Sequence, residues 1–233
     1  MIYWLLFALP GLILGLWAQS RVKGAFKKYS KVRTARNLTG AQVARALLNE
    51  QGLSHVAIEE TQGGSLSDHY DPRSQVLRLS PQVYREPSIA AAGVAAHEMG
   101  HAMQDANKYL PLKFRSALVP ATQFTSRLAP MLFMAGFFLQ LFLKNEIGLY
   151  IAWAGVALFA VAVLFTLITL PVELDASKRA KRLLTSSGIL IGDEIEGVNK
   201  VLDAAALTYV AAAVAAIGQL LYYVMLLSGG RRR

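Results

Sequence analysis

The sequence has no cysteine among its 233 residues. Disulfide bonds and thiolate metal sites are therefore excluded, and any bound metal must be held by His, Asp or Glu. Acidic residues are also scarce, 15 against 24 Lys and Arg, so the formal net charge is +9. The basic residues cluster beside apolar segments, for example at 178–182, which indicates membrane topology and anionic lipid rather than nucleic acid. We expect no nucleic-acid partner.

Charged residues are missing altogether from four apolar segments, at 2–20, 128–143, 147–170 and 204–228. Hydrophobic residues make up 54% of the chain, more than is usual for a soluble domain. A helix over 147–170 would be about 36 Å long, enough to cross a hydrocarbon core of about 30 Å. The block 128–143 is short, so it must extend past Arg127 or use Lys144 at the boundary. The sequence therefore predicts about four transmembrane helices.

The basic residues also predict which side each segment occupies. Segment 2–20 lacks a cleavage site and is followed by seven Lys or Arg within 21–36, so we interpret it as an uncleaved anchor with its N-terminus outside. The short loop 144–146 makes the second and third spans a hairpin, which returns 171–203 to the cytoplasmic side. The arginines at 231–233 disagree with the trend that basic residues lie on the cytoplasmic side, because four spans leave them outside.

The polar portion between the first two spans has signals of a small mixed α/β domain. Thr39 caps a predicted helix that Gly52 stops. Residues 55–61 alternate like a strand that ends at 63–65, and 75–80 alternate again up to Pro81. A further helix is predicted from near Ser88 to about Asn107.

That last helix contains the sequence His-Glu-Met-Gly-His at 97–101. His97 and His101 are four residues apart, so their imidazoles project from one helical face and can share a zinc ion. Glu98 lies to the side, where it can reach a water molecule without being a ligand. The alternative is a pair of unrelated histidines on an amphipathic helix.

A catalytic zinc site needs a third protein ligand and an open position. The candidates on the same predicted side are Glu173, Asp175, His69, Asp68 and Asp71. A carboxylate at a membrane boundary is ordinarily just solvated, so the residues alone leave the third ligand open.

Several stretches in order resemble the YugP-type membrane zinc metallopeptidases of bacteria, namely 27–33, 68–73, 94–101, 171–177 and 201–210. More distantly, the layout is similar to the gluzincin membrane proteases, such as the CAAX prenyl proteases and the heat-shock membrane proteases. The resemblance implies a Zn²⁺ cofactor with His97, His101 and Glu173 as ligands and Glu98 as the catalytic base.

The chain departs from the distant relatives at one position. They carry an aspartate four residues after the ligand glutamate, where this chain has Ser177. We expect Ser177 or Asp175 to orient a zinc histidine.

Substrate-binding residues are expected just before the metal helix. Segment 68–73 leads into the predicted strand 75–80, and in related metallopeptidases an edge strand at that place binds substrate backbone. His69 or Tyr70 could stabilise the oxyanion. The alternative is a hydrogen-bonded turn built on Asp71 and Pro72. Tyr209 is another candidate donor or an interfacial anchor.

Together these expectations describe a mainly α membrane protein with about four transmembrane helices and a small α/β gluzincin-like metallopeptidase domain. The expected function is zinc-dependent hydrolysis of peptides or membrane proteins at the cytoplasmic face of the bacterial inner membrane. The alternatives are a catalytically silent zinc-binding scaffold or sensor and, last, an ion transporter, which would need charges inside its spans.

The expected order of segments is first span 1–20, cytoplasmic metallopeptidase domain 21–115, second span 118–143, third span 147–170, cytoplasmic segment with the third ligand 171–203, and fourth span 204–228.

Overall fold

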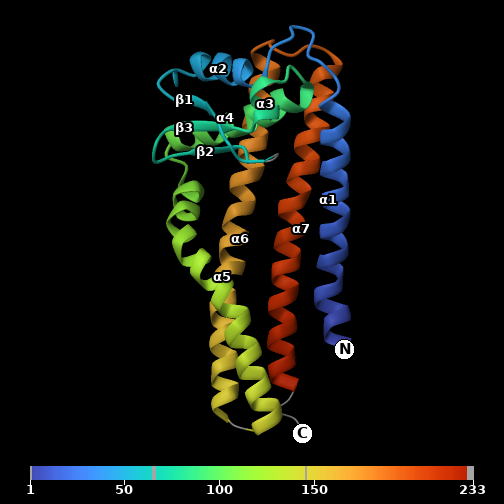
Figure 1. Cartoon of the computed structure of the whole chain (residues 1–233), viewed down its shortest axis with the longest axis vertical. Helices are drawn as coiled ribbons and strands as arrows, with labels where there is room; N and C mark the ends of the chain where they lie inside the picture. The colour runs from blue at the N-terminus through green and yellow to red at the C-terminus, as the bar shows by residue number, and fades with distance from the viewer. Residues whose placement is uncertain (1, 65–66, 145, 230–233) are drawn as a thin grey trace. The chain divides into compact units, whose positions relative to one another are not determined.

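The computed structural model describes residues 2–64, 67–144 and 146–229. The elements in chain order are the π-helical turn η1 (Trp4–Ala8), α1 (Leu9–Tyr29), α2 (Gly40–Glu50), β1 (Ala57–Glu60), β2 (His69–Asp71), β3 (Val76–Leu79), α3 (Pro81–Arg85), α4 (Ile89–Ala106), α5 (Leu110–Leu143), α6 (Glu146–Ser186) and α7 (Asp193–Gly229) (Figure 1). The arginines at 231–233 lie outside the described residues.

Four helices in the described part of the chain are long and apolar enough to cross a membrane: Trp4–Tyr29, α5, α6 and α7. The most apolar windows of α6 and α7 have mean hydropathies of 2.5 and 2.0. Together with the small sheet, these helices confirm the prediction of a mainly α membrane protein with about four transmembrane helices.

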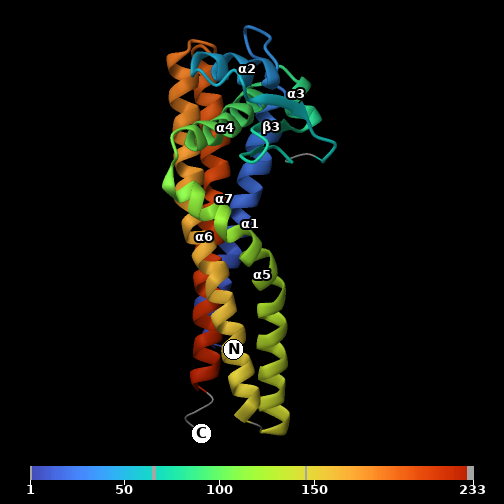
Figure 2. The same cartoon turned by 90° about the vertical axis from the view of Figure 1, so that its left-hand side faces the viewer.

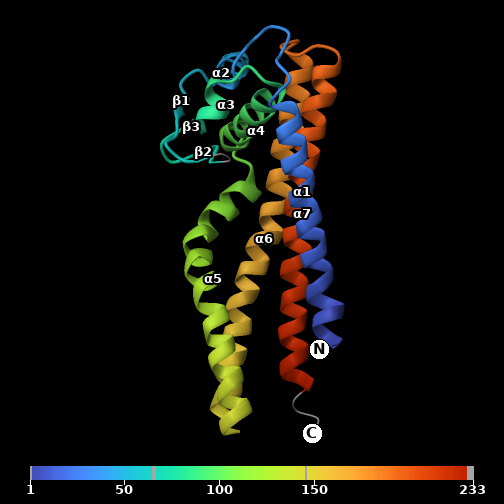
Figure 3. The ribbon, with the colours of Figure 1, turned by 45° about the vertical axis from the view of Figure 1, so that its right-hand side comes forward.

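The short apolar block 128–143 lies within the much longer helix α5. This helix includes Arg127 and has Pro120 and Pro130 in its interior. Each proline lacks the N–H that the helix would use and tends to bend it. Figure 3 shows α5 curved along its length.

The chain divides into two compact units, one formed by Met1–Trp17, Lys113–Pro171 and Tyr209–Arg233, the other by Ala18–Leu112 and Val172–Thr208. In the first unit, small residues let membrane helices approach closely. A Cβ atom added at Gly155 would lie 2.5 Å from the backbone nitrogen of Phe133, and one at Gly136 would lie 2.3 Å from that of Ala152. The end of α5 and the start of α6 therefore form a close hairpin (Figure 2).

The second unit is built on a three-stranded sheet with the order β1-β3-β2. β1 pairs with β3 in parallel and β2 pairs with β3 antiparallel, with Tyr70 opposite Leu77. One buried cluster joins the helices and the sheet; its largest members include Leu47 from α2, Leu79 from β3 and Met99 from α4. Helix α4, which contains His97 and His101, therefore lies in the core of this unit, between other elements.

Local sequence explains where the helices of this unit begin. Thr39 forms a capping box with Gln42 at the start of α2, and the Ser88 side chain accepts from the backbone N–H of Ala91 at the start of α4. Pro81 occupies the first turn of α3, where its missing N–H costs nothing.

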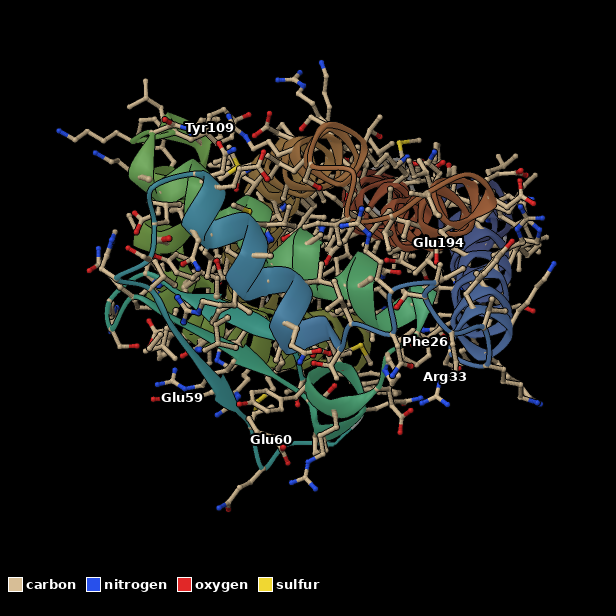
Figure 4. The ribbon with its side chains drawn as sticks, turned by 90° about the horizontal axis from the view of Figure 1, so that it is seen from above. Phe26, Arg33, Glu59, Glu60, Tyr109 and Glu194 are labelled. Atoms are coloured by element: carbon tan, nitrogen blue, oxygen red, sulfur yellow. The ribbon has the colours of Figure 1, made fainter. Side chains whose placement is uncertain are left out.

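The start of α7 is fixed by an acidic side chain. Glu194 accepts hydrogen bonds from the backbone N–H groups of Ala35, at 2.6 Å, and Ile191, at 2.8 Å. Figure 4 labels this side chain beside α7. Glu194 thus connects the segment after α1 to the first turn of α7 within this unit.

Candidate metal centre

Two helices of the second unit carry the candidate ligands. α4 provides His97 and His101, one turn apart, and α6 provides Glu173 two residues after Pro171. The helices can come close because residue 100 is glycine: a Cβ there would lie 2.6 Å from the carbonyl oxygen of Ala176. The sequence of α4 thus fixes both the direction of the imidazoles and their distance from α6.

The three side chains converge at a single carboxylate oxygen. Oε2 of Glu173 lies 3.2 Å from Nε2 of His97 and 3.5 Å from Nε2 of His101. Two ligand atoms of a tetrahedral zinc ion, each about 2.0–2.1 Å from the metal, are about 3.3 Å apart. The observed separations fit that geometry, and the three residues could hold one metal ion.

The site is shielded from solvent and contains two carboxylates, those of Glu98 and Glu173. The side chains of His97, His101 and Glu173 are 12%, 8% and 2% exposed. Burial acts to lower the pKa of His101, but the hydrogen bond with Glu173 and the charge of Glu98 outweigh it and raise that pKa. Carboxylates that favour the cationic imidazolium in this way would also favour a bound cation.

Glu98 is buried next to the ligands but is held by a different element. Its Oε2 accepts a hydrogen bond of 3.1 Å from the backbone N–H of Tyr70 in the edge strand β2. The Tyr70 hydroxyl in turn donates to Asp105, about two turns further along α4, at 3.0 Å. These two bonds fasten β2 to α4 beside Glu98, so this carboxylate stays apart from the ligand trio.

The outer nitrogens of both imidazoles also have partners. Nδ1 of His97 lies 3.1 Å from Oγ of Ser177, and Nδ1 of His101 lies 2.9 Å from Oε1 of Gln104. Such partners orient ligating imidazoles and point Nε2 toward the metal. Sequence reasoning named Ser177 for this place but missed Gln104.

The chain matches, over residues 4–228, the model of a family described as "Putative neutral zinc metallopeptidase". The chain belongs to this family. It is 48% identical over 218 residues to "Putative membrane protease YugP" of Bacillus subtilis (strain 168), which covers 94% of this chain and 93% of that protein. No solved structure matches the chain. The resemblance seen in the sequence is confirmed, and zinc is the metal that fits both the family and the His, His, Glu ligand set.

The other candidates for the third ligand have different partners in the structure. Asp68 accepts from the backbone N–H and the hydroxyl of Ser80, at 2.7 and 3.0 Å. Burial raises the pKa of Asp68, although the bonds to Ser80 act against it. Asp71 accepts from Ser74, Arg73 and Arg78, and these contacts lower its pKa to about 2.

The remaining sequence candidates lie beside the trio or away from it. Asp175 contacts no zinc histidine; its carboxylate accepts from Gln104 and from Arg179, at 2.9 and 2.6 Å. His69 is exposed on β2, with Nδ1 2.8 Å from the carbonyl oxygen of Ser67. Tyr209 belongs to the other compact unit.

Proposed function

We propose that this protein is a membrane zinc endopeptidase in which His97, His101 and Glu173 bind the metal and Glu98 is the general base. The observation that supports it best is the convergence of both Nε2 atoms on one buried carboxylate oxygen. The family match and the membrane-protease relative give the reaction class.

Zinc held by these three side chains supplies Lewis acidity, both to a water molecule and to a peptide carbonyl. Glu98 is the group that takes the proton from the water and later returns it to the leaving amine. The Tyr70 N–H fixes one oxygen of Glu98, which holds the carboxylate in place for that transfer. Exclusion of solvent strengthens these electrostatic interactions.

The edge strand β2 is the element proposed to receive substrate. It pairs on one side with β3 and is attached to α4 through Tyr70, so an extended peptide placed along it would pass the metal. Peptide segments of membrane proteins are the proposed substrates, because the site belongs to a chain with four membrane-spanning helices.

The proposed location is the bacterial inner membrane, with the site at the cytoplasmic face. The support is the charge pattern: basic residues follow the first span within 21–36 and occur again at 178–182, and such clusters favour the cytoplasmic side.

The function is tested with purified protein in proteoliposomes, using fluorogenic peptides and an unfolded protein as substrates. Glu98→Gln preserves the shape of the side chain and leaves the three ligands in place. Hydrolysis should fall by roughly 10²- to 10⁴-fold, the usual contribution of a positioned general base, while zinc content stays near that of the wild type.

The matched control is Glu50→Gln, the same change at an exposed position of α2, which should leave hydrolysis unchanged. Equal activity in wild type and Glu98→Gln would contradict the proposal. Zinc-loaded wild type that hydrolyses none of these substrates would favour the silent scaffold or sensor.

A further inference from the structure

Gln104 has a buried polar side chain in the middle of the metal-bearing helices. It follows His101 by three residues on α4 and is fully buried, with 0% exposure. A buried amide is costly unless its donors and acceptor are paired. All of them are: Oε1 lies 2.9 Å from Nδ1 of His101, and Nε2 lies 2.8 Å from the Val172 carbonyl oxygen and 2.9 Å from Oδ2 of Asp175.

The two oxygens next to Nε2 determine which way the amide faces. The Val172 carbonyl and the Asp175 carboxylate can only accept hydrogen bonds, so the group between them must be the NH₂ end of Gln104. The opposite end, Oε1, can only accept. Nδ1 of His101 must therefore carry the hydrogen in this contact, and the lone pair of the neutral imidazole is left on Nε2, which faces Glu173.

The partner of the His97 imidazole does not determine which ring nitrogen carries the hydrogen. Ser177 contacts Nδ1 of His97 through a hydroxyl group, which can donate or accept. Of the two imidazoles, His101 thus has the more restrictive partner.

The same amide connects the two ligand-bearing helices next to the third ligand. Val172 precedes Glu173 and Asp175 follows it by two residues, so one side chain from α4 holds the turn of α6 that presents the carboxylate. Arg179 fixes Asp175 through a contact of 2.6 Å and lies over the ring of Tyr109, which Figure 4 labels and which lies between α4 and α5. Asp175 therefore acts on the site through Gln104.

We propose that Gln104 is a positioning residue of the metal centre: its amide, oriented by Val172 and Asp175, commits Nε2 of His101 to the metal and sets the distance between His101 and Glu173. The proposal rests on the zinc site proposed above. It assigns Asp175 an indirect role, as the group that keeps the amide from turning over.

The test measures metal binding and not hydrolysis. Zinc affinity is determined by competition with a chelator, and cobalt(II) replaces zinc to give a visible spectrum that reports the ligand geometry. Gln104→Met has similar volume but no acceptor for His101. It should weaken zinc binding by roughly 10- to 100-fold, the usual effect of losing such a partner, and should change the cobalt spectrum. Gln82→Met, at an exposed position of α3, is the matched control and should change neither.

A second variant separates positioning from general destabilisation. Asp175→Ala removes one of the two acceptors that orient the Gln104 amide, at a side chain that is partly exposed and hydrogen-bonds to neither histidine. Zinc affinity should fall and the cobalt spectrum should change in the same direction as in Gln104→Met. This variant decides the question even where Gln104→Met fails to fold.

Two outcomes would overturn the inference: wild-type zinc affinity with an unchanged cobalt spectrum in Gln104→Met, or wild-type zinc affinity with an unchanged cobalt spectrum in Asp175→Ala. A wild-type protein that binds no zinc would instead contradict the proposed function itself, so the two failures are distinguishable.

Discussion

Glu173 is the residue whose role depends most on the fold. It lies in the interior of a 41-residue helix and is 2% exposed, yet both His97 and His101 contact it. A buried carboxylate needs compensating partners, and Nε2 of each imidazole lies 3.2 or 3.5 Å from it. A zinc ion bound by the same three side chains would take over this role.

Substitution of this carboxylate should therefore remove the metal. We expect about one zinc per chain in the wild type and loss of most of it in Glu173→Ala, because two histidines alone are a poor zinc site. His69→Ala, on the exposed side of β2, should keep its zinc. Metal analysis of the purified variants checks this, and full zinc retention by Glu173→Ala would move the third ligand to Asp175, Asp68 or Asp71.

At the scale of residues, the sequence was informative where chemistry follows from local spacing. The proximity of His97, Glu98 and His101 could be predicted because one helix presents them, and their proposed roles follow from that spacing. Glu173 was one of five candidates until the family resemblance selected it, since its place depends on how α6 packs on α4. Gln104 was missed, although a polar residue three positions after a zinc histidine on an apolar helix is the signal that could have found it.

The approach of α4 to α6 is the critical contact at the scale of elements. Gly100 is the position where backbone meets backbone, since an added Cβ would lie 2.6 Å from the Ala176 carbonyl oxygen. Gly93 is on the same helix, but a Cβ there would lie 3.4 Å from the Val198 side chain, an ordinary contact.

These two glycines make a matched pair. Gly100→Ala should force the helices apart, lower the free energy of unfolding by about 1–3 kcal/mol and reduce zinc binding. Gly93→Ala should be neutral or stabilising by up to about 1 kcal/mol, because alanine is the better helix former. Denaturant unfolding and metal analysis of both variants test this, and equal effects at the two positions would show that close packing at Gly100 does not matter.

Elements with strong local signals lie near their predicted positions. Thr39 caps the helix that it was predicted to cap, and Ser88 caps the helix that was predicted to begin near it. The strands over 55–61 and 75–80 occur as the shorter β1 and β3. β2 was not predicted as a strand, because its three residues acquire that conformation by pairing with β3. α3 was also missed, although Pro81 at its start is a helix signal.

At the scale of the whole molecule, the main expectation concerns topology. Residues 20–115 and 171–203 should share the cytoplasmic side, because two spans separate them and both carry basic clusters. The structure shows helices that continue beyond the apolar segments, as α6 does from residue 170 to Ser186. The sequence could predict the apolar spans from missing charge but not these extensions, which packing in the second unit stabilises.

Single engineered cysteines can test that topology without background, since the chain has none. Glu59→Cys and Thr185→Cys, both at exposed positions, should react with a membrane-impermeant reagent only after the cytoplasmic side is opened, whereas Lys144→Cys in the hairpin loop should react in intact cells. Labelling of positions 59 and 185 from opposite sides would contradict the hairpin and the role of Glu173.

The central claim is that His97, His101 and Glu173 hold one zinc ion while Glu98 remains free. X-ray absorption at the zinc edge tests it most directly, on wild type and Glu98→Gln side by side. The account predicts about one zinc per chain in both proteins, with two imidazole ligands and oxygen ligands at about 2.0–2.2 Å and the same spectrum for both. Loss of zinc from Glu98→Gln, or a zinc environment without two imidazoles, would contradict it.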